Sequence, residues 1–484
     1  MKVLLAGLNV DYDLIKELKS KASHQSDITP ETISAAYARI SRSPKPVDEL
    51  RRDALKEVEK ARRSNRNIVF EMGHSSIAEH AVFNIDVLGV SRLLVEEIEK
   101  FRLCSYTEKS QRYVLFDKDY VIPDEISEAG LADVYTETLE MQNDFYHRLY
   151  SVLRPYVFAG NPELAGEAAN KAMLEGWAKE DARYAISLAT QTQLGMTLNA
   201  RNLELMLRRL AASPLAEGRL FAGRLYAATK DIAPSLIRYT KATDYDCLTR
   251  DNLRQLTGRF GLENKRGAVA VKLLWSTPDA DCRAAAALMF ASGRASYESC
   301  LARAGKLTAA EAKALFKESF RYMQPHDAAM RELESVDLLF ELVVSASCFA
   351  QLKRHRMATV ISQDYDPALG VTVPASVRAT GMHRDFMTLV RKTERVFSLI
   401  AQKAPGAAAY VLTNAHRRRV LMKLNVRELY HVARLRADHF AQWDIRNIAN
   451  AMLRQGRKAM PLSLLLAAGK DGFAALNKKI FPRA

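Results

Sequence analysis

The chain has 484 residues, which is too long for one ordinary hydrophobic core and suits two domains of about 200 residues each. A hydrophobic fraction of 48% with 26% charged residues excludes the disordered and fibrous classes, and no apolar run approaches the roughly 20 residues of a membrane span. The formal charge of +15 is concentrated, because residues 401–484 carry 16 Lys and Arg against 4 Asp and Glu. Such a segment favours anionic ligands, although a solvated basic surface would have the same composition.

The cysteines and the N-terminus both point to the cytoplasm. The five cysteines are scattered without a C-x-x-C pair, so we expect neither a disulfide framework nor a zinc site. Reduced thiols fit a reducing compartment. The apolar stretch from Met1 to Leu8 is too short for a signal peptide and predicts a first β-strand.

Helical periodicity dominates the chain after this strand. Apolar residues recur at three- and four-residue spacing over residues 31–66, 131–154, 202–229 and 308–323. Residues 267–276 have the composition of a second opening strand, and the preceding stretch collects Thr, Asp and Gly without a persistent helical stripe. We therefore expect an α+β fold with long helices around small antiparallel sheets. The expected domains are 1–240 and 267–484, joined by a linker over 241–266.

Two blocks recur in the same order in both halves. Residues 198–203 (LNARNL) resemble residues 424–429 (LNVREL), and each block opens an amphipathic helix. Upstream, Glu79 and Glu334 each precede an alternating apolar segment and a helix that ends in basic residues. Each match alone is weak, but their shared order indicates two fused copies that form a pseudo-dimer within one chain.

Residues 102–113 place a carboxylate, a hydroxyl and a guanidinium close together in one turn. Glu108, Ser110 and Arg112 could offer a nucleotide a phosphate-pairing arginine, a hydroxyl and backbone N–H groups. A surface turn with an ordinary Glu–Arg pair has the same sequence. The motif alone does not separate these alternatives.

The second half carries a different set of polar residues. Gln351 and Arg354 lie three residues apart on one expected helical face beside His355, although basic residues there could simply complement a helix dipole. A helix expected over residues 426–453 places Arg436 on its apolar stripe. A guanidinium on a buried face needs an acceptor, which a core ion pair, a bound anion or a carbonyl-rich base would supply.

Three segments resemble the flavin-dependent thymidylate synthases (ThyX family). They are residues 73–80 with the turn ending at Tyr113, residues 351–356, which are similar to the family's Arg-His-Arg flavin motif, and residues 435–446, which are close to its C-terminal signature. The resemblance covers most of both halves. It implies reductive methylation of dUMP to dTMP, with methylenetetrahydrofolate giving the carbon and FAD, reduced by NADPH, giving the hydride. Because the family is tetrameric, a fused pair implies a homodimer, or pseudo-tetramer.

The first copy departs from the family pattern in one half of its nucleotide site. It keeps the turn at residues 108–112, and Arg183 stands where the family has a further nucleotide-binding arginine. Phe101 occupies the middle of its Arg-His-Arg position, and Leu210 replaces the arginine that Arg436 supplies in the second copy.

The second copy shows the reverse pattern. Its turn has Asp364 in place of the arginine, and Ala409 stands where the first copy has Arg183. In the family, one subunit gives the turn and the distant arginine, and another gives the remaining groups. The two losses are complementary, so our hypothesis is one composite active site between the copies and a decayed symmetry mate.

The resemblance implies a role for each matching residue and no metal. Arg436 stabilises negative charge on the uracil ring, Arg354 places the pyrimidine, and Ser110 positions the nucleotide rather than acting as a nucleophile. The residues expected to bind dUMP are Glu108, Ser110, Gln111, Arg112, Arg183, Gln351, Arg354 and Arg436. Those expected to bind FAD are His74, Ser76, Glu79, Asn199, Arg201, Arg354, His355, Arg356, Asn425, Arg427 and His431.

Two other functions are compatible with the sequence. Lys109 and Gln111 stand where the family usually has an apolar residue and a glycine, so the substrate could be another pyrimidine nucleotide or a uracil in RNA. A non-catalytic binding protein on an inherited fold would bind no flavin and would bind polynucleotides in a strongly salt-dependent way. The basic residues lack the interleaved aromatics of a stacking platform, so nucleic acid is not the expected partner.

Overall fold

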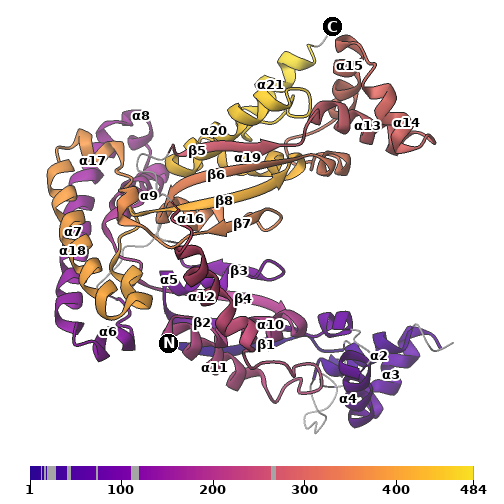
Figure 1. Ribbon diagram of the computed structural model, residues 1–484, viewed down its shortest axis with the longest axis horizontal. Helices are drawn as coiled ribbons and strands as arrows, with labels where there is room; N and C mark the ends of the chain where they lie inside the picture. The colour runs from indigo at the N-terminus through magenta and orange to yellow at the C-terminus, as the bar shows by residue number, and fades with distance from the viewer. Residues whose placement is uncertain are drawn as a thin grey trace. The chain divides into compact units, whose positions relative to one another are not determined.

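The computed structural model describes residues 1–11, 14–15, 18, 29–40, 45–71, 75–110, 119–262 and 269–482. The chain divides into two compact units (Figure 1). Unit 1 contains residues 1–179, 186–264 and 387–412, and unit 2 contains residues 180–185, 265–386 and 413–484. Each unit is built mainly from one half of the sequence and is completed by a short segment of the other half.

Unit 1 contains a four-stranded antiparallel sheet in the order β1-β2-β4-β3. Alternate residues of β2 are buried, which is the pattern of a strand with one face on the core. The strands are β1 (Lys2–Leu8), β2 (Val82–Ser91), β3 (Ser105–Glu108) and β4 (Gln191–Asn199). The helices are α2 (Glu31–Ile40), α3 (Val47–Lys56), α4 (Val58–Arg66), α5 (Arg92–Ile98), α6 (Asp124–Glu128), α7 (Ala132–Ala159), α8 (Pro162–Ala165), α10 (Ala200–Ala211), α11 (Ala216–Thr229) and α12 (Asp244–Gly258).

Unit 2 repeats this topology, with its sheet in the order β5-β6-β8-β7. The strands are β5 (Val271–Ser276), β6 (Asp337–Ser345), β7 (Thr359–Ser362) and β8 (Arg417–Asn425). The helices are α13 (Ala280–Ser292), α14 (Tyr297–Ala304), α15 (Ala309–Phe320), α16 (Ala346–Leu352), α17 (Ala375–Ala379), α19 (Val426–Arg436), α20 (Trp443–Ala459) and α21 (Phe473–Ile480). Two further helices, α9 (Lys171–Ala182) and α18 (His383–Lys403), cross the division between the units along the chain.

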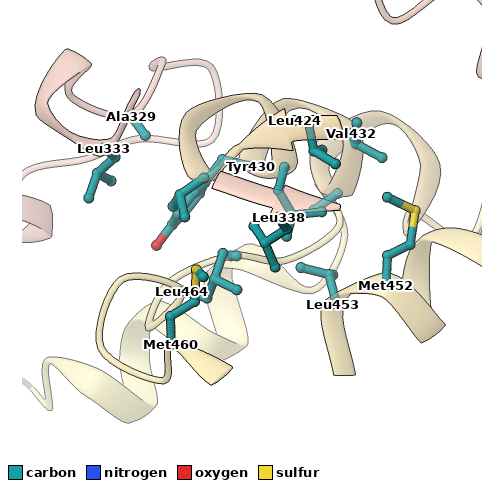
Figure 2. Close-up of a cluster of buried hydrophobic side chains, with 14 of the residues drawn as sticks. Ala329, Leu333, Leu338, Leu424, Tyr430, Val432, Met452, Leu453, Met460 and Leu464 are labelled. Atoms are coloured by element: carbon teal, nitrogen blue, oxygen red, sulfur yellow. The ribbon is translucent and has the colours of Figure 1, made fainter. Parts of the chain in front are cut away.

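The core of unit 2 joins its sheet to helices α19 and α20. Leu338 of β6, Leu424 of β8 and Val432 of α19 are almost fully buried beside Met452 and Leu453 of α20 (Figure 2). Burial of each such side chain contributes about 1.5–3 kcal/mol. This packing fixes the start of α20 and the end of α19, where several of the predicted site residues lie.

The two exchanged segments are bonded within the units that they complete. In unit 1, the backbone N–H groups of Leu188 and Ala189 donate to the carbonyls of Leu412 and Tyr410 at 2.8 and 3.0 Å. In unit 2, Asn414 Nδ2 donates to the carbonyl of Arg183 at 3.0 Å. Arg183 therefore belongs to the unit that is otherwise formed by the second half of the chain.

Three long helical stretches of the sequence are shorter helices in the structure. Residues 31–66 form α2, α3 and α4, and residues 202–229 divide near Pro214, which has no N–H to donate and disfavours helix before it. The helix predicted over residues 426–453 is interrupted between α19 and α20. There Asp438 Oδ1 accepts from the N–H of Phe440, and such side-chain bonds compete with helical ones. Phe440 is 64% exposed, so the apolar stripe expected along this helix does not continue through the interruption.

The segment predicted as a linker contains a helix, α12. Its local signal is a capping box, in which the side chains of Thr243 and Asp246 each bond the other's backbone N–H. No residue of α12 is buried, so it lacks the apolar stripe that marks helices packed on a core. The predicted boundaries at residues 240 and 267 stay a prediction.

The α+β prediction is confirmed, because small antiparallel sheets and long helices make up both units. The strand predicted at Met1–Leu8 is β1, and the strand predicted at residues 267–276 contains β5. Among the described residues, no helix combines the length and the apolar character needed to cross a membrane.

Candidate functional site

A polar cluster in unit 2 joins the end of α19 to the turn after α16. Arg436, the last residue of α19, donates from Nε to His355 Nε2 at 3.2 Å and from Nη2 to the carbonyl of Gln351 at 3.3 Å. His355 Nδ1 lies 3.4 Å from Glu428 Oε1. His355 is 2% exposed, and burial lowers its pKa, so the ring is neutral at neutral pH.

Arg183 is fixed in unit 2 by its neighbour Tyr184. The Tyr184 hydroxyl donates to Asp444 Oδ2 at 3.0 Å and accepts from Gln442 Nε2 at 2.9 Å. Its ring stacks on Trp443 with the centroids 5.6 Å apart. A tyrosine anchored at three points fixes the backbone of the segment that carries Arg183 within unit 2.

Arg183 and Gln351 of unit 2 present buried donors that nothing in the described part of the chain accepts. Arg183 is 6% exposed, yet its Nε and Nη2 have no hydrogen-bond partner there. The same holds for Gln351 Nε2. A buried donor without an acceptor costs about 1–3 kcal/mol, and more when it is charged. The arrangement therefore suits an acceptor-rich, anionic ligand that would complete it.

A buried carboxylate, Asp444, and a half-buried one, Asp181, lie beside Arg183. Burial raises the pKa of Asp444, while hydrogen bonds from Ser345 and Tyr184 lower it, and the charge of Arg183 lowers it further. Burial also raises the pKa of Asp181 to about 6, even though Trp443 Nε1 donates to its Oδ1 at 2.7 Å. These groups balance the charge of Arg183 through space without using its free N–H groups.

The remaining predicted residues of this unit are accessible. Arg354 and Arg356 are exposed on either side of buried His355, and His431 is exposed with its ring 5.7 Å from that of His355. The structure thus brings Arg183, Gln351, His355 and Arg436 into unit 2 together. It places two exposed guanidinium groups in the same turn.

The predicted turn of unit 1 begins with a buried ion pair. The Glu108 carboxylate pairs with Arg92, the first residue of α5, and accepts from Thr192 Oγ1 at 3.3 Å. Its side chain is only 1% exposed, which gives Glu108 a structural role. Ser110 and Lys109 line a cavity of about 570 Å³ over β2, β3 and β4. Of the predicted turn at residues 102–113, the structure describes residues 102–110.

The residues predicted for flavin in unit 1 lie at the opposite end of its sheet. Glu79 forms an ion pair with Arg201, and Asn199 caps α10 by accepting from the N–H of Asn202 at 2.9 Å. Ser76 is exposed in the same region. Along β4, Asn199 and Thr192 are seven residues apart, or about 24 Å. Unit 1 therefore does not bring its two groups of predicted residues together.

Unit 2 repeats this end of the sheet. Arg427 pairs with Glu334 at 2.9 Å and donates to the carbonyl of Ala329 at 2.7 Å. Asn425 caps α19 by accepting from the N–H of Glu428 at 2.8 Å. The Asn-x-Arg motif thus has the same structural task in both units, so these contacts do not say which motif faces a flavin. His74, Gln111 and Arg112 lie outside the described residues.

Strand pairing changes one equivalence that the sequence suggested. Tyr106 and Val360 lie opposite Met196 and Met422, which are equivalent residues of β4 and β8. Counting forward, Asp364 is the counterpart of Ser110 and not of an arginine. Gapless matching of short motifs cannot fix a loop register, whereas backbone pairing does.

Sequence reasoning missed the partners that hold the predicted residues. Arg92, Tyr184 and Asp444 are buried polar side chains whose partners are distant in sequence, and Glu428 is another. Tyr184, Asp444 and Glu428 carried a signal, because Tyr184 adjoins Arg183 and the other two lie within segments that were singled out. Burial of a polar group is not readable from one sequence.

Comparison with known proteins identifies related chains. A family model described as "Thymidylate synthase complementing protein" matches residues 25–235 and 272–462. A "UPF0159 protein" of Chlamydia muridarum is 26% identical, covering 82% of this chain and 79% of the relative. A "Flavin-dependent thymidylate synthase" of Clostridium tetani is 32% identical, covering 44% of this chain and 82% of the relative. A solved flavin-dependent thymidylate synthase from Helicobacter pylori, complexed with FAD and dUMP, matches 49% of this chain and all of its own at 16% identity and a TM-score of 0.32.

Proposed function

We propose, from the premise that the chain belongs to the thymidylate synthase complementing protein family, that it is a flavin-dependent thymidylate synthase. The reaction would be reductive methylation of dUMP to dTMP. One observation carries the proposal: Arg183 from the first half of the sequence lies in unit 2 with Gln351 and Arg436, and two of these three side chains hold buried donors with no acceptor among the described residues.

The donors match the acceptors of a nucleoside monophosphate. A guanidinium binds phosphate oxygens by charge-assisted hydrogen bonds, and Arg183 has the unused donors for that. A uracil ring presents carbonyl oxygens, which suit Gln351 Nε2 and Arg436. When N3 loses its proton, negative charge spreads over the ring and makes C5 nucleophilic. A fixed guanidinium such as Arg436 stabilises that charge electrostatically.

The turn at residues 353–356 fits the phosphates of FAD. Arg354 and Arg356 are exposed cations, and His355 between them is held in place. Asn425 and Arg427 are already engaged by backbone and by Glu334, so they fit less well. When bound, the flavin supplies the hydride, NADPH reduces it, and methylenetetrahydrofolate gives the carbon.

The assignment of Glu108, Ser110 and Arg112 to dUMP stays a prediction from the sequence, as does the composite site. We expect Arg112→Ala and Arg436→Ala each to abolish dUMP binding in equilibrium dialysis. Leu210→Ala, at the counterpart of Arg436, and Asp364→Ala, in the corresponding turn of unit 2, are the controls and should bind dUMP nearly normally. Normal dUMP binding by Arg112→Ala would contradict the composite site.

The visible spectrum of the purified protein, reconstituted with FAD and titrated with dUMP, tests the proposal directly. A bound-flavin spectrum that dUMP perturbs supports thymidylate synthesis, and production of dTMP from dUMP completes the test. A bound flavin without a dUMP response would indicate another pyrimidine substrate. Absence of flavin binding would indicate a non-catalytic nucleotide-binding protein. We further propose a cytoplasmic homodimer, which light scattering of the purified chain tests.

A further inference from the structure

Three residues of unit 2 form a line from a buried carboxylate to the arginine at the end of α19. Arg436 Nε donates to His355 Nε2 at 3.2 Å, and His355 Nδ1 lies 3.4 Å from Glu428 Oε1. Glu428 is 6% exposed and lies on α19, eight residues before Arg436. His355 comes from the turn after α16 and bridges two residues of one helix.

The proton of His355 can be assigned from its neighbours. A guanidinium only donates hydrogen bonds, so His355 Nε2 must be the acceptor. A neutral imidazole then carries its proton on Nδ1, which faces Glu428. A charged imidazolium would place two cations 3.2 Å apart in a buried region, which is unfavourable.

Glu428 has no other task in the described part of the chain. Its Oε1 and the Nδ1 of His355 face each other at 3.4 Å and have no hydrogen-bond partner elsewhere in that part of the chain, and neither meets the geometry of a hydrogen bond with the other. The Glu428 carboxylate forms no ion pair there with a lysine or arginine. A buried carboxylate is costly unless a donor faces it. The imidazole N–H is that donor, so the two side chains orient each other.

Unit 1 lacks all three members of this line. The sheet register and the helix starts make Asn202, Phe101 and Leu210 the counterparts of Glu428, His355 and Arg436. Asn202 bonds its neighbour Asn199, and Leu210 is buried in the apolar core of unit 1 with Phe101 packed against it. The acid is present only where the imidazole and the guanidinium are present.

We infer that Glu428 is a positioning residue: through the Nδ1–H of His355 it fixes the side chain of Arg436 for its task at the pyrimidine. The role of Arg436 at the pyrimidine rests on the proposed function. The arrangement of Glu428, His355 and Arg436 does not depend on it. A carboxylate behind a histidine holds the tautomer and the ring orientation, as outer partners do for histidines that act on a metal or substrate.

The first experiment records long-range proton–nitrogen correlations of the ten histidines in the full-length, nitrogen-15-labelled protein. The His355→Gln variant identifies the His355 signals. We expect the Nδ1-protonated tautomer, and a lower His355 pKa in Glu428→Gln because the carboxylate favours the charged ring. Glu217→Gln, the same change at a buried glutamate of unit 1, should leave His355 unchanged.

An Nε2-protonated His355, or a pKa unaffected by Glu428→Gln, would overturn the inference. So would Zn²⁺ binding at His355, since the candidate ligand atoms of His355, Glu428 and His431 lie within 4.8 Å of one another. The second measurement is kinetic. Glu428→Gln should lower kcat about tenfold and leave the KM for dUMP within about twofold, whereas general destabilisation would affect both. Absence of dTMP formation by the wild type would refute the proposed function and leave the spectroscopic result standing.

Discussion

In unit 2 a buried carboxylate, Asp444, accepts hydrogen bonds from Ser345 Oγ at 2.6 Å and from the Tyr184 hydroxyl at 3.0 Å. In unit 1 the corresponding carboxylate accepts from a serine and a tyrosine in the same way. There Ser91 Oγ and the Tyr410 hydroxyl donate to Glu217 at 2.5 and 2.8 Å. In each unit the serine caps the helix that follows β2 or β6, and the tyrosine comes from the other half of the sequence.

The residues beside these tyrosines differ. Arg183 precedes Tyr184, whereas Ala409 precedes Tyr410. A polar network kept in both units serves the fold, because it anchors the exchanged segment in each. Among the described residues, the guanidinium of Arg183, whose Nε and Nη2 have no hydrogen-bond partner, has no counterpart at Ala409 of unit 1. We propose that it binds a ligand. Comparison within one chain thus separates structural polar residues from functional ones.

The largest expected loss of stability concerns a pair that only unit 1 has. Arg92→Ala should lower the free energy of unfolding by about 3–5 kcal/mol, because it removes the cation that pairs with the buried carboxylate of Glu108. Urea titration followed by circular dichroism measures this. Replacing both Arg92 and Glu108 by leucine should recover most of the loss. If the double variant is as unstable as Arg92→Ala, the ion pair is not the cause.

The largest expected loss of activity concerns Arg436 and its counterpart. Arg436→Ala should reduce dTMP formation by at least about 10²–10³-fold, because it removes a donor that binds dUMP and that stabilises the charge developing on the ring. Leu210→Ala should keep the activity but lower the stability of unit 1 by about 2–5 kcal/mol, since it leaves a cavity in the core. Activity assays and urea titrations of the two variants show whether the two positions differ in function. Equal activity losses would mean that the two positions are not functionally distinct.

Asp181 predicts a pH dependence of stability in unit 2. Its pKa is raised from 3.8 to about 6 by burial, so the folded state holds its proton more tightly than the unfolded chain. That contribution is complete below about pH 4 and is lost as the pH rises through about 6. Asp181→Asn mimics the protonated acid and should be more stable than the wild type at pH 7.5 by up to about 3 kcal/mol. Unfolding midpoints of the wild type and of Asp181→Asn at several pH values measure this difference in stability. A difference that stays constant with pH would contradict the prediction.

The smallest expected effects test the shared network. Tyr184→Phe and Tyr410→Phe each remove one hydrogen bond to a buried carboxylate and should cost about 1–3 kcal/mol. Only Tyr184→Phe should also weaken dUMP binding, because its neighbour is Arg183. Calorimetric titration with dUMP distinguishes the two variants. A similar change in dUMP affinity for both variants would mean that the tyrosine beside Arg183 is no more important for binding than the tyrosine beside Ala409.

Most of the fold was predictable from local patterns. The opening strands and the two-copy architecture follow from periodicity and repetition, and the family match covers both copies. The helix boundaries were not predictable, because they depend on side-chain bonds such as that of Asp438 to the N–H of Phe440. The helix α12 was missed since its capping box is short and it buries nothing.

The residues of the site were predictable only where they belong to a recognisable sequence motif. Gln351, His355 and Arg436 lie together as the motifs suggested, and Arg183 joins their unit. Glu428 could not be predicted, because its role depends on which nitrogen of His355 faces it. That is decided by tertiary packing, which one sequence does not contain.

The exchanged segments have a consequence for synthesis on the ribosome. Unit 1 needs residues 387–412, which emerge about 150 residues after the rest of it. At 5–20 residues per second this delay is roughly 7 to 30 seconds. During that time the buried side chain of Gln142, which donates to Thr393 and to the carbonyl of Val411 in the folded unit, lacks these acceptors. Nascent chains of this protein should therefore depend on chaperones more than chains whose domains close in order.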